Sequence, residues 1–185
     1  MSIIPRLILI NFFFILLFIN ESGASLEFKN CNDFNFNKTE IPIKEIEIKI
    51  NNYRKWQVNN INIITDNSHV INKKLKKRFK AKIFVTFQDN NTCKYTARIR
   101  THGDLKDHII YKDGKVYQSL DVELKDGHIN NIVKFKLFLP GTRGVEQDEI
   151  FMTEILRYFD FISPRTSLVN VKVNDEKSVM LFQEK

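Results

Sequence analysis

The sequence predicts an α+β domain built from a mostly antiparallel β-sheet and one main helix. One observation is the alternation of apolar and polar residues in several short runs, which is the pattern of strands with one buried face. A second is a single apolar stripe at helical spacing, between Val145 and Phe159. A third is the set of turn signals, rich in Asn, Asp and Gly, that separates neighbouring runs and favours hairpins.

The first half of the chain supplies one strand and one clear hairpin. Three isoleucines alternate with charged residues over residues 45–50, which predicts a half-buried strand. Residues 79–88 and 92–101 alternate in the same way on either side of an Asp-Asn-Asn turn. Between the strand and the hairpin, residues 51–60 predict a short turn or helix, and residues 61–72 predict a loop with weak strand character.

The second half places the main helix between strands. Phe151, Ile155 and Phe159 follow one another at a spacing of four, so we expect them to form the buried stripe of the helix. Pro164 prevents the helix from continuing. The strands and hairpins expected on either side of it cover residues 111–117, 120–124, 132–140, 168–173 and 178–183.

The N-terminus has the pattern of a secretory signal peptide. One positive charge precedes the apolar residues 7–19, and small residues end at Ala24. A membrane anchor is the alternative, but the apolar run is short against the ~20 residues that span a bilayer. We therefore expect a signal peptide over residues 1–24, an N-terminal tail over 25–45 and one β-rich domain over 46–185. The chain is expected to be exported (secreted, periplasmic or at the cell surface), with no stable membrane span.

The charge of the chain favours an anionic partner, although a solvated basic surface is the alternative. The 185 residues include 29 Lys and Arg against 22 Asp and Glu, which gives a net charge of +7. Such a charge favours phosphorylated ligands, anionic polymers or membrane surfaces. The one dense basic cluster, Lys73–Arg78, lacks the interleaved aromatic residues of a single-strand binder, so nucleic acid is not expected.

Two cysteines, Cys31 and Cys93, follow the expected signal peptide. Exported proteins meet an oxidising compartment, so an even count favours a disulfide, with free buried thiols as the alternative. The bridge would tie the N-terminal tail to the hairpin strand at residues 92–101.

A polar cluster follows that strand. It consists of His102, Asp104, Asp107 and His108. These side chains could ligate a metal through nitrogen and oxygen, but their spacing matches no strong motif. We expect them to bond backbone N–H groups of their own loop instead, and we predict no metal site.

The strand at residues 132–140 carries Lys134 and Lys136 on one face, because side chains alternate along a strand. Protein kinases place a phosphate-binding lysine on a strand and pair it with a glutamate of the next helix. Glu149 and Glu154 lie on opposite edges of the predicted helical stripe, where either could reach the sheet. An exposed strand with two solvated lysines is the alternative, since the motif is short.

Short motifs in the domain come in the order of a known family. They are Ile99-Arg-Thr-His-Gly-Asp104, Lys134-Phe-Lys-Leu-Phe-Leu-Pro140, Thr142-Arg143, Glu149-Ile150, Ser163-Pro-Arg165, Val171-Lys-Val-Asn174 and Phe182-Gln-Glu184. Together they resemble the N-terminal half of the CotH kinase-like family, exported atypical kinases related to spore-coat proteins. The resemblance spans residues 46–185, and the order is more specific than any one motif.

The resemblance implies the N-terminal lobe of an atypical kinase fold and ATP-dependent phosphorylation of protein Ser or Thr, with Mg²⁺. It assigns the nucleotide-binding positions to Lys134, Lys136, Arg143, Arg100, Glu149 and Glu154. One lysine and the arginines would contact phosphate, and one glutamate would order that lysine. The catalytic and metal-binding aspartates would lie beyond Lys185, so this chain would be an N-terminal fragment that is inactive alone.

Two positions depart from the family pattern, and a second function class competes with the kinase. Many members have Gly where this chain has Asp160 at the helix end and Asp175 after the strand that follows. The competing class is a non-catalytic exported module. It would bind an anionic glycan or a cell-envelope polymer through exposed Trp56, Tyr111 and Tyr117.

Overall fold

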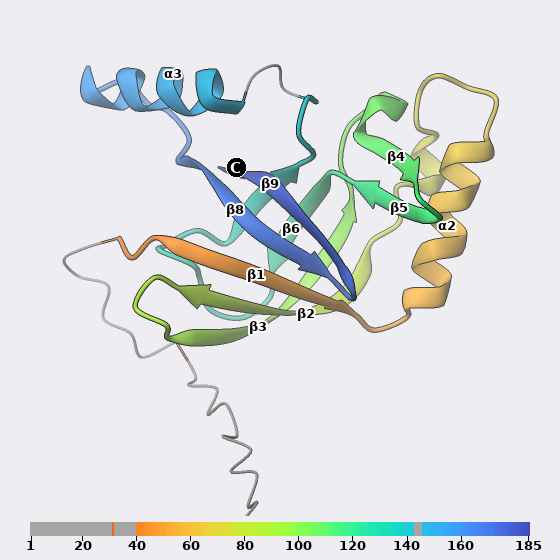
Figure 1. Ribbon diagram of the computed structural model, residues 1–185, viewed down its shortest axis with the longest axis horizontal. Coiled ribbons are helices and arrows are strands. Elements are labelled where there is room, and N and C mark those ends of the chain that lie inside the picture. The colour runs from red at the N-terminus through yellow and green to blue at the C-terminus, as the bar shows by residue number, and fades with distance from the viewer. Residues whose placement is uncertain (1–30, 32–39, 143–145) are drawn as a thin grey trace, which may run out of the picture.

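Seven strands close into a β-barrel in the computed structural model, which describes residues 31, 40–142 and 146–185. Around the barrel the strands follow the order β1-β2-β3-β6-β7-β9-β8 (Figure 1). They are β1 (Ile43–Ile50), β2 (Phe79–Phe87), β3 (Thr92–Thr101), β6 (Leu120–Leu124), β7 (Lys134–Phe138), β8 (Thr166–Val173) and β9 (Glu176–Glu184). The other elements are α2 (Tyr53–Thr65), η3 (Lys73–Leu75), η4 (Lys106–His108), β4 (Ile109–Lys112), β5 (Lys115–Gln118) and α3 (Glu146–Tyr158).

The barrel closes because β1 pairs along both of its edges. It runs antiparallel to β2 and parallel to β8, with Ile46 opposite Val85 on one side and Val171 on the other. These three side chains are buried in the barrel core, as the alternation of each strand requires. The parallel pair joins segments that lie more than a hundred residues apart in the sequence.

The expected fold, an α+β domain resembling the N-terminal lobe of an atypical kinase, is therefore wrong. Of the residues that the structure describes, 47% lie in strands and 22% in helices, and the main sheet is a closed barrel of seven strands. The individual hairpins were predicted because alternation and turn signals are local. The parallel pairing of β1 with β8 leaves no local signal, since alternation does not specify the partner at a strand's second edge.

The disulfide expected between Cys31 and Cys93 is present, with the two Cα atoms 5.6 Å apart. Both cysteines are buried in the main core cluster. The bridge therefore ties a residue that precedes the barrel to β3. The expected signal peptide lies outside the described residues, as does most of the expected tail, and β1 begins at Ile43, two residues before the tail was expected to end.

Helix α2 forms the helix that was one of the two alternatives expected over residues 51–60, and it continues to Thr65, into residues that were expected to be a loop. Its buried side chains include Trp56, Asn60 and Ile63, which share one face at spacings of four and three. Trp56 is only 1% exposed and packs edge-on against Phe79, with ring centroids 5.1 Å apart. Because asparagines occupy part of the buried face, the apolar period of this helix is weak in the sequence.

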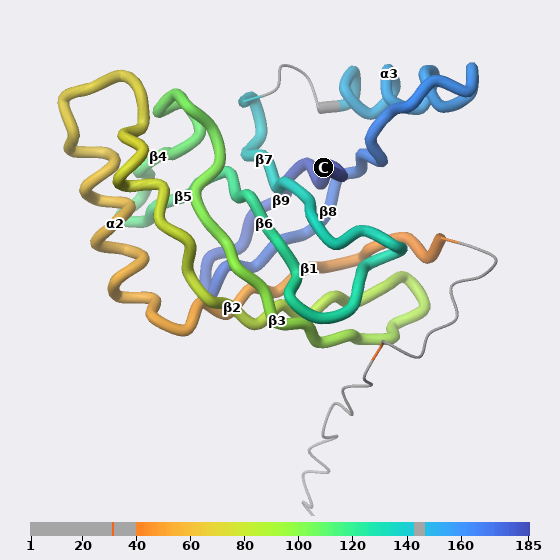
Figure 2. Tube along the Cα trace, turned by 180° about the vertical axis from the view of Figure 1, so that it is seen from behind, coloured from red at the N-terminus to blue at the C-terminus, as the bar shows by residue number. Residues whose placement is uncertain are grey.

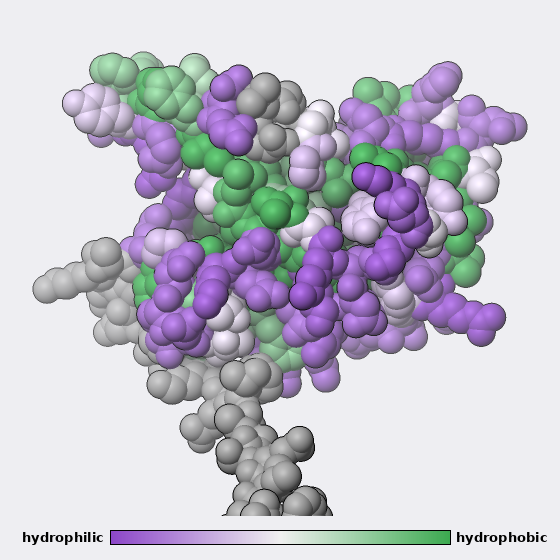
Figure 3. Space-filling model, in the orientation of Figure 1, coloured by the Kyte–Doolittle hydropathy of each residue, from purple (hydrophilic) through white to green (hydrophobic). Residues whose placement is uncertain are grey.

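Helix α3 forms where it was expected, but its apolar stripe points away from the barrel. Phe151 is 64% exposed and Tyr158 is 84% exposed, whereas Thr153 is buried and its hydroxyl donates to the Glu149 carbonyl. Apolar side chains accordingly gather on α3 at the upper left of Figure 3. Helical spacing predicts a stripe but not what covers it. None of the described helices is long and apolar enough to cross a membrane.

Candidate functional site

A row of polar side chains crosses the outer face of the barrel on four adjacent strands. Figure 2 shows β3, β6 and β7 side by side on the face turned toward the viewer. Strand register places Arg100 of β3 opposite Asp121 of β6, Asp121 opposite Lys136 of β7, and Lys136 opposite Gln183 of β9. We call these four residues the cationic row. Side chains in register on adjacent strands of one face lie close enough to interact, so the four residues form one continuous row.

Asp121 is the anchor of the cationic row. It is only 2% exposed, and its Oδ2 accepts hydrogen bonds from Arg100 Nε at 3.1 Å and Nη2 at 2.8 Å. Lys185 Nζ donates to the same oxygen at 3.0 Å. Burial alone would raise the pKa of Asp121, but the hydrogen bonds from Arg100 and Lys185 outweigh it and hold the pKa below its ordinary value. The carboxylate is therefore ionised and fixes two cations in place.

His102 and Phe138 flank the cationic row beside Lys136. The His102 ring packs edge-on against Phe138 at 5.0 Å between centroids, and Lys136 Nζ lies 5.6 Å from the centroid of the same phenyl ring. Burial, Lys136 and His108 lower the pKa of His102 to about 4. The imidazole is therefore neutral at pH 7, and it can exchange hydrogen bonds with a ligand without repelling the cations.

Gly103 lets the chain turn tightly beside His102. Its φ is +92°, and a Cβ at this position would lie 1.9 Å from Cδ2 of His108. A side chain here would therefore be strained and would also clash. His108 in turn contacts Ser119 Oγ through Nδ1 at 3.1 Å, which fixes the loop over the end of β6.

Glu149 is the acidic side chain of α3 that reaches the cationic row. Its Oε1 accepts a hydrogen bond of 2.8 Å from Gln183 Nε2, and Gln183 is the register partner of Lys136. Glu154 instead pairs with Arg157 at 2.9 Å within the same helix. The structure thus separates two glutamates that were equivalent in the sequence.

The two lysines of β7 are separated in the same way. Lys136 lies in the cationic row, whereas Lys134 is exposed and lies two residues along the same strand, opposite Glu123. Glu123 already pairs with Arg78 at 3.1 Å and Lys125 at 2.7 Å. Of the six residues predicted to bind nucleotide, the structure therefore brings together Arg100, Lys136 and Glu149. It leaves Lys134 and Glu154 outside the row, and Arg143 lies outside the described residues.

Sequence reasoning missed Asp121, Gln183 and Lys185 as members of the site. The alternation of β6 indicated that Asp121 points outward, and an outward acid on a strand is ordinarily solvated. Its burial follows from the cations supplied by β3 and by the residue after β9. Finding these residues would have required the register of three strands, and alternation alone does not fix that register.

A second ion pair ties the loop after α3 to the end of β9. Arg165 donates from Nε to Glu184 Oε2 at 2.8 Å and from Nη2 to Oε1 at 3.1 Å, while Nη1 donates to Glu40 at 2.7 Å. The hydrogen bond from Arg165 lowers the pKa of Glu184, and the same bond raises the pKa of Arg165. This pair is a structural clamp between two of the motifs that carry the resemblance.

The polar cluster beside the row is held by other interactions. Asp104 pairs with Lys76, and the His102 and His108 rings pack on each other at 5.2 Å. In the part of the chain that the structure describes, no three His, Cys, Asp or Glu side chains gather as metal ligands would. That these residues bind no metal stays a prediction.

The aromatic surface expected for the competing function is not formed. Trp56 is buried against Phe79, so it cannot offer a ring to a polymer. Tyr111 is exposed, and Tyr117 is half-buried.

Comparison with known families and with curated proteins finds no match for this chain. The resemblance to the CotH kinase-like family therefore rests on the motifs themselves.

Proposed function

We propose that this chain supplies the phosphate-contacting part of an exported, ATP-dependent kinase of protein Ser or Thr that resembles the CotH family. The observation that carries the proposal is the cationic row, in which Lys136 lies between Asp121 and Gln183. The proposal does not depend on a kinase-like lobe, because the row is built on the outer face of a closed barrel.

The chemistry of the row suits a polyphosphate. Arg100, Lys136 and Lys185 surround one buried carboxylate, so positive charge is in excess on this face. Asp121 restrains Arg100 and Lys185 before any ligand arrives, which reduces the entropy lost on binding. Phosphate oxygens form charge-assisted hydrogen bonds with such cations.

Glu149 corresponds to the helix glutamate that kinases use to order their lysine. It contacts the row through Gln183, directly beside Lys136. We therefore assign the ordering role to Glu149 rather than Glu154, and phosphate contact to Lys136 rather than Lys134.

The described residues fit the phosphates of ATP but not its Mg²⁺. Asp121 is occupied by Arg100 and Lys185, and Asp104 is paired with Lys76. Neither carboxylate is available to a divalent cation. Carboxylates other than these two would therefore have to hold the metal.

Calorimetry of Mg-ATP binding by the full-length protein tests the proposal. Lys136→Ala should weaken binding by about 1–3 kcal/mol, the range for a hydrogen bond to a charged group. Lys134→Ala is the matched control, because it removes the same charge two residues along the same strand, and it should leave the affinity within about twofold. Unchanged affinity in both single variants and in the double variant would contradict the proposal.

Activity measurements extend the test to the helix. Glu149→Ala should reduce phosphorylation of a protein substrate, whereas Glu154→Ala should not, because only Glu149 reaches the row. Equal effects of the two substitutions would contradict the assignment of the lysine-ordering role to Glu149.

A further inference from the structure

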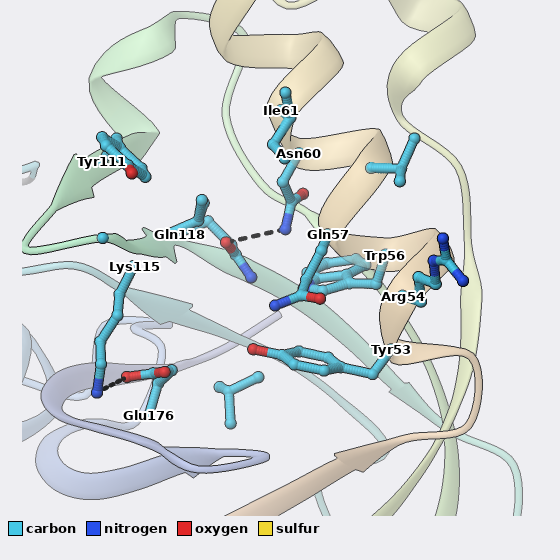
Figure 4. Close-up of a pocket in the computed structure, with 14 residues that line it drawn as sticks. Tyr53, Arg54, Trp56, Gln57, Asn60, Ile61, Tyr111, Lys115, Gln118 and Glu176 are labelled. Carbon is cyan, nitrogen blue, oxygen red and sulfur yellow. Dashed lines mark hydrogen bonds and ion pairs between the residues drawn. The ribbon is translucent and has the colours of Figure 1, made fainter.

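A pocket of about 320 Å³ lies between α2 and the β4–β5 hairpin, and none of the cationic row lines it. Small-molecule pockets span roughly 300–1,000 Å³, so this one can hold a small ligand. Figure 4 shows Tyr53 and Tyr111 on opposite sides of the pocket, with Gln118 between them. The lining also includes Gln57 and Asn60 of α2.

The floor of the pocket is an ordered chain of hydrogen bonds. Thr101 Oγ1 donates to Asn60 Oδ1 at 3.4 Å, so the Asn60 amide nitrogen is directed toward Gln118. Asn60 Nδ2 then donates to Gln118 Oε1 at 3.1 Å. Asn60 is 1% exposed and Gln118 is 6% exposed, so both amides are held inside the protein.

This series of hydrogen bonds leaves one donor, the side-chain nitrogen of Gln118, directed into the pocket. The Gln118 oxygen is used by Asn60, and the Gln118 nitrogen points toward Gln57 and Tyr53 (Figure 4). Gln118 Nε2 is not among the fully buried side-chain atoms of the described residues that lack a partner, so it is accessible from the pocket. A ligand in the pocket can therefore accept a hydrogen bond from it.

The two opposite charges at the pocket wall compensate each other. Lys115 Nζ pairs with Glu176 Oε2 at 2.7 Å at the pocket wall. Arg54 is exposed and points away from Tyr53 and Gln118 (Figure 4). Burial, and then the charge of Glu176, raise the pKa of Tyr53, so its phenol is neutral at pH 7. The pocket therefore favours an uncharged ligand.

We propose that this pocket binds a neutral saccharide of one or two sugar rings. A sugar combines hydroxyl groups, which would accept from Gln118 Nε2 and exchange hydrogen bonds with Gln57 and Tyr53, with an apolar C–H face. The exposed ring of Tyr111 at the mouth offers a surface for that face. The proposal concerns a second site and is independent of nucleotide binding at the cationic row.

An NMR titration of the isotope-labelled full-length protein tests the proposal. The probes are maltose, cellobiose and N,N′-diacetylchitobiose, with the anionic sugar sialyllactose as a control. At least one neutral disaccharide should shift the side-chain amide signals of Gln118 and saturate with a dissociation constant on the order of 1 mM. No shift with any neutral probe at roughly 20 mM, or a response to sialyllactose alone, would overturn the proposal.

Two substitutions check that the binding is at this pocket. Tyr111→Ala should weaken binding about tenfold, whereas Tyr111→Phe, which keeps the ring, should bind within about twofold of the parent. Gln118→Glu keeps an acceptor for Asn60 but removes the donor, so it should abolish binding. Binding that is unchanged in Tyr111→Ala and Gln118→Glu would overturn the proposal. The dispersion of the backbone amide signals in the same spectra serves as the folding control and should be unchanged in Tyr111→Ala.

Discussion

Arg100 donates two hydrogen bonds to a single oxygen of Asp121, from Nε at 3.1 Å and from Nη2 at 2.8 Å. The two residues are register partners on β3 and β6, and Lys185 donates to the same oxygen from the far end of β9. One buried carboxylate therefore joins three segments of the barrel and holds two cations on its outer face. Folding and the proposed phosphate site depend on the same interaction.

Asp121→Asn should destabilise the fold. The substitution keeps the shape but replaces charge-assisted hydrogen bonds with weaker ones, and it leaves Arg100 and Lys185 without a counter-ion. The free energy of unfolding should fall by about 1–3 kcal/mol in urea titrations. Glu123→Gln is the control, because it removes a more exposed carboxylate two residues along the same strand and should cost less than Asp121→Asn. Equal losses in the two variants would contradict the anchor role.

Stability should decrease as the pH falls from about 6.5 toward 4, in part because of His102. Its folded-state pKa of about 4 lies below the ordinary value of 6.5, so the unfolded chain binds a proton that the folded chain excludes. The contribution of His102 to the free energy of unfolding is fully present above pH 6.5 and is lost progressively as the pH falls toward 4. After allowance for its partial exposure, this contribution is up to about 2 kcal/mol.

Replacement of His102 by Gln should reduce this pH dependence. The measurement is the free energy of unfolding in urea at several pH values between 4 and 7, for the parent and the variant. In the variant, the remaining slope of the free energy of unfolding against pH comes from the other titrating groups. An identical slope in both proteins would show that His102 is protonated equally in the folded and unfolded states.

Gly103→Ala should be strongly destabilising. The residue has a φ of +92°, and its Cβ would lie 1.9 Å from His108, so both backbone strain and a clash oppose the substitution. Gly114→Ala is a matched control, since Gly114 has a φ of +77° but nothing within 4 Å of a Cβ. We expect about 1 kcal/mol for Gly114→Ala and at least about 2 kcal/mol for Gly103→Ala, measured by thermal or urea unfolding. A smaller loss at Gly103 than at Gly114 would be inconsistent with close packing on His108.

The Cys31–Cys93 disulfide should survive purification and stabilise the fold. It links residues that are 62 positions apart, and restricting a loop of this length in the unfolded chain contributes about 4 kcal/mol in the chain-entropy account. The double substitution to serine should lower stability by up to that amount. Thiol labelling under denaturing, non-reducing conditions checks the bridge itself, and two labelled thiols per chain would refute it.

Export is expected to leave a mature N-terminus at or within a residue or two of Ser25. The apolar residues 7–19 and the small residues that end at Ala24 are the basis for this prediction. N-terminal sequencing of secreted material is the measurement. An intact Met1 would favour a membrane anchor.

Within the strands, alternation separated inward from outward side chains well, but it could not rank the outward ones. Lys134 and Lys136 share one face of β7 and are equivalent by alternation, as are Arg98 and Arg100 on β3. Only the register of β3, β6, β7 and β9 places Arg100 and Lys136 in one row around Asp121. Register depends on how turns and neighbouring strands fit together, so it is not written in any one strand.

Local patterns determined most of the strands, helix α3 and the disulfide pairing of the two cysteines in the sequence. Alternation and helical spacing are properties of short segments, and the number of cysteines is a property of composition. Tertiary structure decided the rest. The parallel pairing of β1 with β8 closed the sheet, the contacts of α2 buried Trp56, and the apolar stripe of α3 was left exposed. Each of these outcomes depends on what lies opposite a segment in space, and a periodic pattern specifies the face of a segment without specifying its partner.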